Sequence, residues 1–145
     1  MTIYTKKGES LLYEKESYVL RGIWMKIYNE LGPGYKESVY VKVFIQELRN
    51  NKILFEHEKS INSIRQGEKT GSYRPDFVIN DKIIIEFKAL EFLPRVCLKQ
   101  LKSYLVSSKY KLGFLVNFGG SKLQISRQIN DKAKKDQSAL SAKSV

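Results

Sequence analysis

Two charged residues stand at the end of the most apolar stretch of the sequence. Glu86 and Lys88 follow the run from Ile83 to Ile85 and lie two positions apart, so in a strand their side chains leave the same face. Asp76 lies in the preceding stretch, and the Asn80-Asp81 turn folds that stretch back beside Glu86. A buried charge costs several kcal/mol without a partner, so these side chains must compensate one another or bind a cation.

The length of the turn decides whether the two acids meet. A two-residue loop would pair Ile79 with Lys82 and point Asp76 away from Glu86. A three-residue loop or a bulge would instead place Asp76 opposite Glu86. We predict the longer connection.

A third carboxylate, Glu37, falls on a helical pattern. At about 100° per residue, Phe44 and Leu48 lie close to the direction of Glu37, so we expect this acid on the buried stripe of the helix. The alternative is that Glu37 caps its helix or pairs with an arginine such as Arg21 or Arg74.

Together these residues are the set that a divalent metal site needs. Asp76, Glu86 and Glu37 offer oxygen ligands to a hard cation such as Mg²⁺, and Lys88 adds a positive charge near the bound water. The alternative is a structural ion-pair network within the sheet. Two acids beside one lysine leave excess negative charge, which favours the metal.

The whole chain is basic and has the composition of a folded protein. Its 145 residues carry 26 Lys and Arg against 15 Asp and Glu, a formal net charge of +11, and 42% of them are hydrophobic. This length fits one domain with a real core. One cysteine and one histidine exclude a disulfide framework and the usual zinc ligand sets. The positive field favours a polyanionic partner, of which nucleic acid is the commonest in a cell.

Neither a leader nor a membrane span is expected. The first nine residues contain no apolar run of the signal-peptide type, and no apolar run reaches the roughly 18 residues of a membrane helix. We therefore expect a soluble cytoplasmic protein without a membrane partner.

The hydrophobic periodicity predicts an α/β domain over residues 1–129. Its order is two helices, three strands, a helix and two strands, which gives a mixed sheet flanked by helices. Residues 130–145 are polar and are expected to form a disordered tail. A turn is expected at 67–71. Helices are expected at 9–31, 36–50 and 95–108, and strands at 53–65, 72–79, 82–90, 111–118 and 122–129.

The acids and the lysine also carry a family resemblance. Arg74-Pro75-Asp76 followed by Glu86-Phe87-Lys88 resembles the PD-(D/E)XK motif of the restriction-endonuclease-like nuclease superfamily. The resemblance extends over about residues 18–129 and implies a restriction-endonuclease-like core with a mixed β-sheet.

A second motif precedes the first. The stretch from Leu31 to Tyr40 resembles the naming motif of the GxxExxY protein family, with Gly34, Glu37 and Tyr40 at its three fixed places. That family is assigned to the same superfamily, so the two motifs point to one fold and one chemistry.

The resemblance implies a role for each residue of the motif. Asp76, Glu86 and the backbone carbonyl of Phe87 would be ligands of Mg²⁺, with Mn²⁺ as a substitute. Lys88 would be catalytic, because it would orient or help deprotonate the attacking water. Glu37 would hold a metal-bound water or a second ion.

Residues of the third predicted helix complete the expected site. By the same resemblance Gln100 and Tyr104 would line it and take part in catalysis; the alternative is an ordinary amphipathic helix. His57 is expected to be a strand residue and Cys97 a core residue, both outside the site. The expected nucleic-acid contacts are Lys99, Lys102, Arg74 and Lys36.

The sequence therefore predicts a Mg²⁺-dependent nuclease, an endonuclease or exonuclease, that hydrolyses phosphodiester bonds in DNA rather than RNA. A homodimer is expected, because two active sites can address two strands. The alternative is a non-catalytic module on the same fold that binds nucleic acid or a protein partner.

Overall fold

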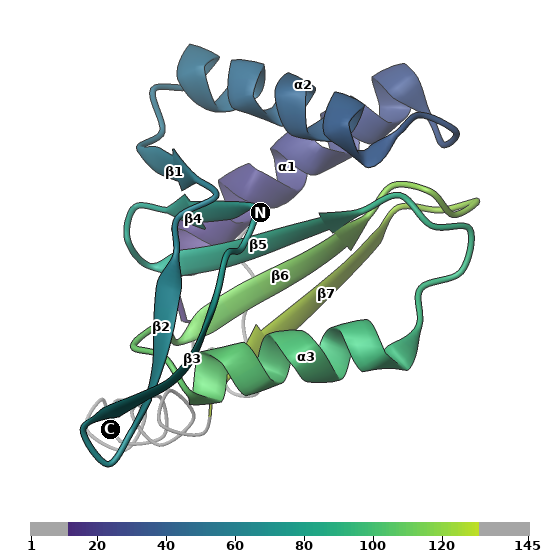
Figure 1. The fold of residues 1–145 in the computed structure, drawn as a ribbon. Coiled ribbons are helices and arrows are strands. Elements are labelled where there is room, and N and C mark those ends of the chain that lie inside the picture. Colours follow the sequence, from purple (N-terminus) through teal and green to yellow (C-terminus); the bar gives the residue numbers. More distant parts are fainter. Residues whose placement is uncertain (1–11, 131–145) are drawn as a thin grey trace, which may run out of the picture.

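The computed structural model describes residues 12–130, which form three helices and seven strands (Figure 1). The helices are α1 (Glu14–Leu31), α2 (Glu37–Asn50) and α3 (Arg95–Val106). The strands are β1 (Phe55–His57), β2 (Ile61–Arg65), β3 (Glu68–Tyr73), β4 (Phe77–Ile79), β5 (Ile83–Lys88), β6 (Leu112–Asn117) and β7 (Gln124–Ile129).

Five of these strands form one mixed sheet in the order β1-β4-β5-β6-β7. β5 and β6 are parallel, and α3 connects them, whereas the other neighbours are antiparallel. Helices α1 and α2 cover one face of the sheet and α3 covers the other (Figure 1). The α/β architecture with a mixed sheet is the one that the sequence predicts.

Alternation along β5 supplies both faces of the core. Ile83, Ile85 and Phe87 point towards α1 and α2, where they are fully buried. The centre of this layer is Phe44 of α2, whose ring centroid lies 4.8 Å from that of Phe77 and 5.1 Å from that of Phe87. The aromatic side chains therefore fasten α2 over the centre of the sheet.

The opposite face of β5 packs against α3. Ile84 shares a buried cluster with Leu101 and Leu105 of α3. A side chain at Gly113 of β6 would come within 3.1 Å of the Leu101 side chain, so the glycine allows the helix to lie close to the sheet. The middle of α3 therefore lies close to the end of β5.

The strands predicted at 53–65 and 72–79 are each divided in two. The chain leaves the main sheet at Glu58, which has a left-handed φ of 56°, and returns at Asp76. The Glu58 N–H donates to the Asp76 carbonyl oxygen at 3.0 Å, so the two ends of this excursion are joined. β2 and β3 within it form a separate two-stranded sheet.

The turn of this hairpin differs from the predicted one at 67–71. Arg65 pairs with Glu68, so the turn consists of Gln66 and Gly67, which have φ values of 51° and 80°. Such a two-residue turn with positive φ matches the twist of a hairpin. Gly71, expected in the turn, lies instead within β3.

The ends of the expected domain fall partly outside the described residues. The start of the first predicted helix and residues 131–145 of the predicted tail lie there. Asn130, expected to open the tail, is buried, and its side chain donates to the Tyr110 carbonyl oxygen at 2.7 Å. No helix within residues 12–130 has the length and apolarity that crossing a membrane requires.

Candidate active site

The β4–β5 connection places the first two acids opposite each other. Ile79 pairs with Ile83 and Phe77 with Ile85, so three residues form the loop. One step further along this register, Asp76 faces Glu86. The longer connection predicted from the sequence is confirmed. Within it Asn80 and Asp81 both adopt a φ of 52°, which these residue types tolerate.

A backbone hydrogen bond fixes the Asp76 side chain. The Phe87 N–H donates to Asp76 Oδ2 at 2.7 Å. A carboxylate can accept about four hydrogen bonds, so this contact sets its orientation and leaves acceptor capacity for a cation. Asp76 is thereby attached to the strand that carries Glu86.

The electrostatics of this pair favour a bound cation. Burial and the Asp76 charge raise the pKa of Glu86 from 4.5 to about 8, although Lys88 opposes the shift. Burial also raises the pKa of Asp76, against the hydrogen bond from Phe87 and the charges of Lys88 and His57. Lys88 alone therefore does not neutralise Asp76 and Glu86. A structural ion-pair network would require such neutralisation.

Glu86 and Lys88 open into a cleft of about 200 Å³ between the sheet and α3. Gln100 and Tyr104 line the same cleft from α3, and Gln100 Nε2 donates to the Tyr104 hydroxyl at 2.7 Å. The structure thus brings both predicted helix residues to the acids.

Four further residues line the cleft that the sequence did not assign to it: Tyr73, Cys97, Leu101 and Leu115. The expectation that Cys97 lies outside the site is wrong. Its spacing of three and seven residues from Gln100 and Tyr104 puts it on the same face of α3, a signal that was available. The ring of Tyr73 stacks on that of Tyr104, with centroids 3.7 Å apart and an angle of 11°.

Glu37 lies at the rim of the site rather than in the core. It is the first residue of α2 and is exposed, so the predicted burial beside Phe44 is wrong; no preceding helical turn covers it. Partial burial of its carboxylate and the charge of Asp76 raise its pKa, and Lys88 opposes them. Glu37 therefore interacts electrostatically with Asp76 and Lys88 from the start of α2, whereas Gln100 and Tyr104 approach from α3.

The alternative roles of Glu37 do not match the structure. Between residues 12 and 130, no ion pair joins it to Arg21 or Arg74. No side-chain hydrogen bond caps the start of α2 either. Glu37 directly follows the loop that precedes the helix.

That loop explains the spacing of the second motif. Gly34 has a φ of +110°, which favours glycine. The Tyr40 hydroxyl donates to the Gly32 carbonyl oxygen at 2.6 Å and accepts from the Tyr35 N–H at 3.3 Å. The glycine and the tyrosine shape the loop, and this shape presents Glu37 towards the acids.

The predicted nucleic-acid contacts divide into two groups. Arg74 is exposed and lines the cleft. Lys36, just before α2, and Lys99, within α3, are also exposed. Lys102 instead donates to the Ile129 carbonyl oxygen, which turns it towards β7. His57 lies in β1 with its ring against Phe77, as a strand residue should.

The donor set fits a hard divalent cation with few protein ligands. Among the described residues there is no group of three or more His, Cys, Asp and Glu side chains arranged to hold a metal. Asp76 and Glu86 are two carboxylates, and the backbone of Phe87 lies between Glu86 and Lys88. Mg²⁺ is usually bound through one or two carboxylates and keeps several waters, so these residues suffice for it.

Residues 14–128 match the profile of the PD-(D/E)XK nuclease superfamily. The chain belongs to this superfamily. The match spans α1 to β7 and includes both arms of the motif, the first just before β4 and the second on β5. It confirms the superfamily and its restriction-endonuclease-like fold, and it does not extend to the narrower GxxExxY family.

Two solved structures are similar to this superfamily member. The crystal structure of SSO0001 matches with a TM-score of 0.45 and 21% identity, over 81% of this chain and 69% of that chain. An alkaline exonuclease, LHK-Exo from Laribacter hongkongensis, matches with a TM-score of 0.38 and 10% identity, over 92% of this chain and 81% of that chain. A search of curated proteins gave no match.

Proposed function

We propose that this superfamily member is a Mg²⁺-dependent nuclease that hydrolyses phosphodiester bonds in DNA in preference to RNA. The observation that carries the proposal is the pairing of Asp76 with Glu86. Lys88 lies on the same face of β5 as Glu86, and these two residues line a cleft. Two acids with raised pKa values beside one lysine favour a bound cation over a purely structural network.

Asp76, Glu86 and the Phe87 backbone carbonyl would hold the ion. When bound, Mg²⁺ polarises the scissile phosphate and lowers the pKa of a bound water. The hydrogen bond from the Phe87 N–H keeps the Asp76 carboxylate in one orientation, so little rearrangement is needed on binding.

Lys88 supplies the positive charge of the protein at this place. It ends β5 two residues after Glu86, and its amine would orient the attacking water and stabilise negative charge that develops on the phosphate. Glu37 would hold water or a second ion at the rim, which its interaction with both Asp76 and Lys88 supports.

Gln100 and Tyr104 would position the substrate from the α3 side of the cleft. Their mutual hydrogen bond and the stacking of Tyr73 on Tyr104 fix both groups before substrate arrives. The side-chain amide and the hydroxyl can donate to phosphate oxygens. Arg74 lies at the same cleft, and Lys36 and Lys99 would contact the flanking backbone. The cytoplasmic location and the homodimer remain predictions.

Cleavage assays with matched variants test the proposal. Labelled duplex, single strand, flap, four-way junction and RNA are incubated with Mg²⁺, Mn²⁺ or EDTA. We expect metal-dependent cleavage of DNA by the wild type and by Glu91→Gln, and none by Asp76→Asn. Glu91 is a suitable control because it is an exposed acid that does not line the cleft.

The other outcomes identify the alternative. Binding of nucleic acid without cleavage under every metal condition would support the non-catalytic module. Full cleavage by Asp76→Asn would remove this residue from the catalytic set.

A further inference from the structure

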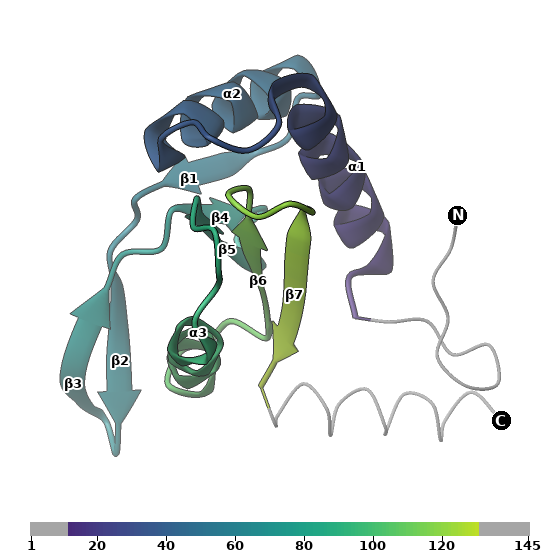
Figure 2. The same ribbon diagram turned by 90° about the vertical axis from the view of Figure 1, so that its right-hand side faces the viewer.

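The β2–β3 hairpin projects from the body of the protein as a free-standing ribbon (Figure 2). It pairs with none of the five strands of the main sheet. The six residues of β3 extend it by roughly 20 Å, at about 3.4 Å per residue. All residues from Ile64 to Thr70 are exposed, so the outer half of the ribbon is open to a partner.

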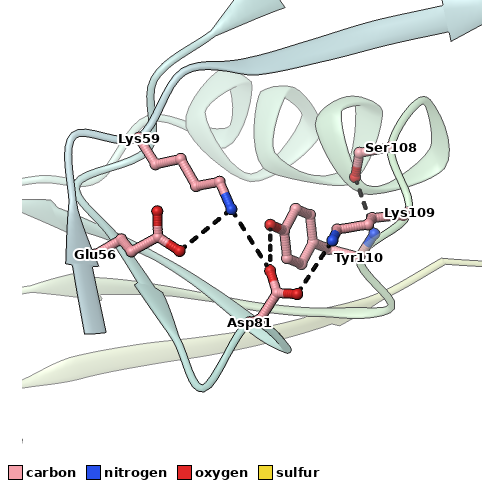
Figure 3. Close-up of polar contacts among 6 residues, drawn as sticks. All are labelled: Glu56, Lys59, Asp81, Ser108, Lys109 and Tyr110. Carbon is pink, nitrogen blue, oxygen red and sulfur yellow. Dashed lines mark hydrogen bonds and ion pairs between the residues drawn. The ribbon is translucent and has the colours of Figure 1, made fainter. Parts of the chain in front are cut away.

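The ribbon is firmly attached at its base. Lys59, just before β2, pairs with Glu56 at 3.2 Å and with Asp81 at 3.6 Å, as Figure 3 shows. Tyr110 and Lys109 hold the same Asp81 carboxylate at 2.9 and 3.1 Å.

A second contact attaches β2 to the end of α3. The Ile64 N–H donates to the Ser107 carbonyl oxygen at 3.3 Å, and the hydroxyls of Ser63 and Ser107 lie 3.3 Å apart. The ribbon is therefore held to the turn before β5 and to the end of α3.

The far end of the ribbon has the chemistry of a nucleic-acid contact. Arg65 and Lys69 lie there with Glu68, and between residues 12 and 130 neither cation takes part in an ion pair. Ile64, which pairs with Lys69 across the ribbon, is 50% exposed. Lys69 shares one face of the ribbon with Ile64, and Arg65 lies on the other face opposite Glu68, so each face offers one cation to the phosphates along a groove.

The other end of the ribbon leads directly into the candidate site. β3 ends at Tyr73, which lines the cleft together with Arg74, and Asp76 follows. A ligand that extends along the ribbon from its far end would therefore reach the cleft.

We propose that the β2–β3 ribbon enters the major groove of duplex DNA and so places one strand of the duplex in the cleft. This inference rests on the proposed function and names its substrate class. The major groove of B-form DNA is about 12 Å wide and admits a two-stranded β-ribbon. The major groove of A-form RNA is deep and narrow, and side chains cannot read it. A single strand offers no groove.

Binding measurements that need no cleavage test the inference. Every protein carries Asp76→Asn, and dissociation constants are measured by fluorescence anisotropy for duplex DNA, single-stranded DNA and duplex RNA. The ribbon variant is Arg65→Glu with Lys69→Glu. The matched control is Lys42→Glu with Lys52→Glu, which makes the same charge change in exposed residues on α2 and just after it, over the other face of the sheet.

We expect the ribbon variant to bind duplex DNA at least about tenfold more weakly than the control, with a salt slope lower by about two. Its affinity for single strands and duplex RNA should match that of the control. Methylation of guanine N7, which lies in the major groove, should weaken duplex binding by the parent protein and not by the ribbon variant.

Three results would overturn the inference: equal duplex affinity of the ribbon variant and the control, an equal loss on all three nucleic acids, or indifference of the parent protein to N7 methylation. Ribbon-dependent duplex binding by a wild type that cleaves nothing would refute the nuclease while leaving the inference intact. Cleavage of duplex DNA that is unaffected by the substitutions at Arg65 and Lys69 would refute the inference while leaving the nuclease proposal intact.

Discussion

Raising the pH should destabilise the metal-free protein, because Glu86 is then forced to carry its charge. In the unfolded chain this carboxyl loses its proton near its ordinary pKa of 4.5, whereas in the folded protein the pKa is about 8. Between these values the folded state holds one proton more than the unfolded state. The free energy of unfolding then falls by about 1.4 kcal/mol per pH unit, and the contribution of Glu86 is greatest below pH 4.5 and lost by pH 8.

The size of the effect is measurable by thermal unfolding. Between pH 5 and pH 7 the loss is about 3 kcal/mol, which corresponds to about 10 °C in Tm for a domain of this size. The raised pKa values of Asp76 and Glu37 act in the same direction. Comparison with Glu86→Gln isolates the part that belongs to Glu86.

Melting curves in EDTA from pH 5 to pH 8.5 would be recorded for the wild type, Glu86→Gln and the control Glu91→Gln, an exposed residue three positions beyond Lys88. We expect Tm to fall with pH in the wild type and the control, and much less in Glu86→Gln, which becomes the most stable of the three at pH 8. Addition of Mg²⁺ at pH 8 should raise Tm in the wild type more than in Glu86→Gln. Parallel pH curves for the wild type and Glu86→Gln would refute this reasoning.

Four substitutions away from the acids test the packing of the fold by urea denaturation. Gly119→Ala should destabilise the protein by at least about 2 kcal/mol, because its Cβ would lie 2.3 Å from the backbone nitrogen of Leu90. Gly22→Ala, at a helical position with open space around it, should stabilise the protein by about 0.5–1 kcal/mol. Similar changes in the free energy of unfolding for the two variants would contradict the packing around Gly119. Phe44→Ala should cost about 3–5 kcal/mol because it removes the centre of the aromatic layer, and a loss below 1 kcal/mol would be unexpected. Tyr40→Phe should cost about 1 kcal/mol through the lost hydroxyl hydrogen bond, and no change at all would argue against its role in the loop before α2.

The elements that the sequence predicts well are those with a strong local signal. The continuous run from Ile83 to Ile85 marks a strand buried on both faces, and β5 is the central strand of the main sheet. The Asn80-Asp81 pair marks a hairpin turn, since both residue types accept a left-handed conformation. Such residues suit a two-residue turn as well as the three-residue loop that forms, so they do not by themselves fix the register of Asp76 and Glu86.

The division of the strands has no comparable signal. The excursion begins at Glu58, whose left-handed φ of 56° is unusual for its residue type, so periodicity alone continues the strand to residue 65. Gly71 resembles a turn residue but lies in β3 next to a bulge, where Ser63 is its partner. Both features arise from tertiary contacts at the base of the ribbon.

The exposure of Glu37 has a similar origin. A helical wheel gives the direction of a side chain and not the place where the helix ends, and α2 begins at this residue. The position of Cys97 at the cleft, by contrast, could be predicted from its spacing on α3.

The hydrogen bond between Glu58 and Asp76 closes residues 59–75 into a unit whose two ends lie side by side. Because the closure cost of a loop grows only slowly with its length, a longer, shorter or unrelated segment could replace the part of this unit between Lys59 and Tyr73 while β1 stays paired with β4. If the ribbon binds the substrate as proposed, exchange of that part between relatives would alter substrate choice while Tyr73, Arg74 and Glu86 stay at the cleft. Lys59 and Tyr73 are then the natural junctions for grafting a new recognition element onto this scaffold.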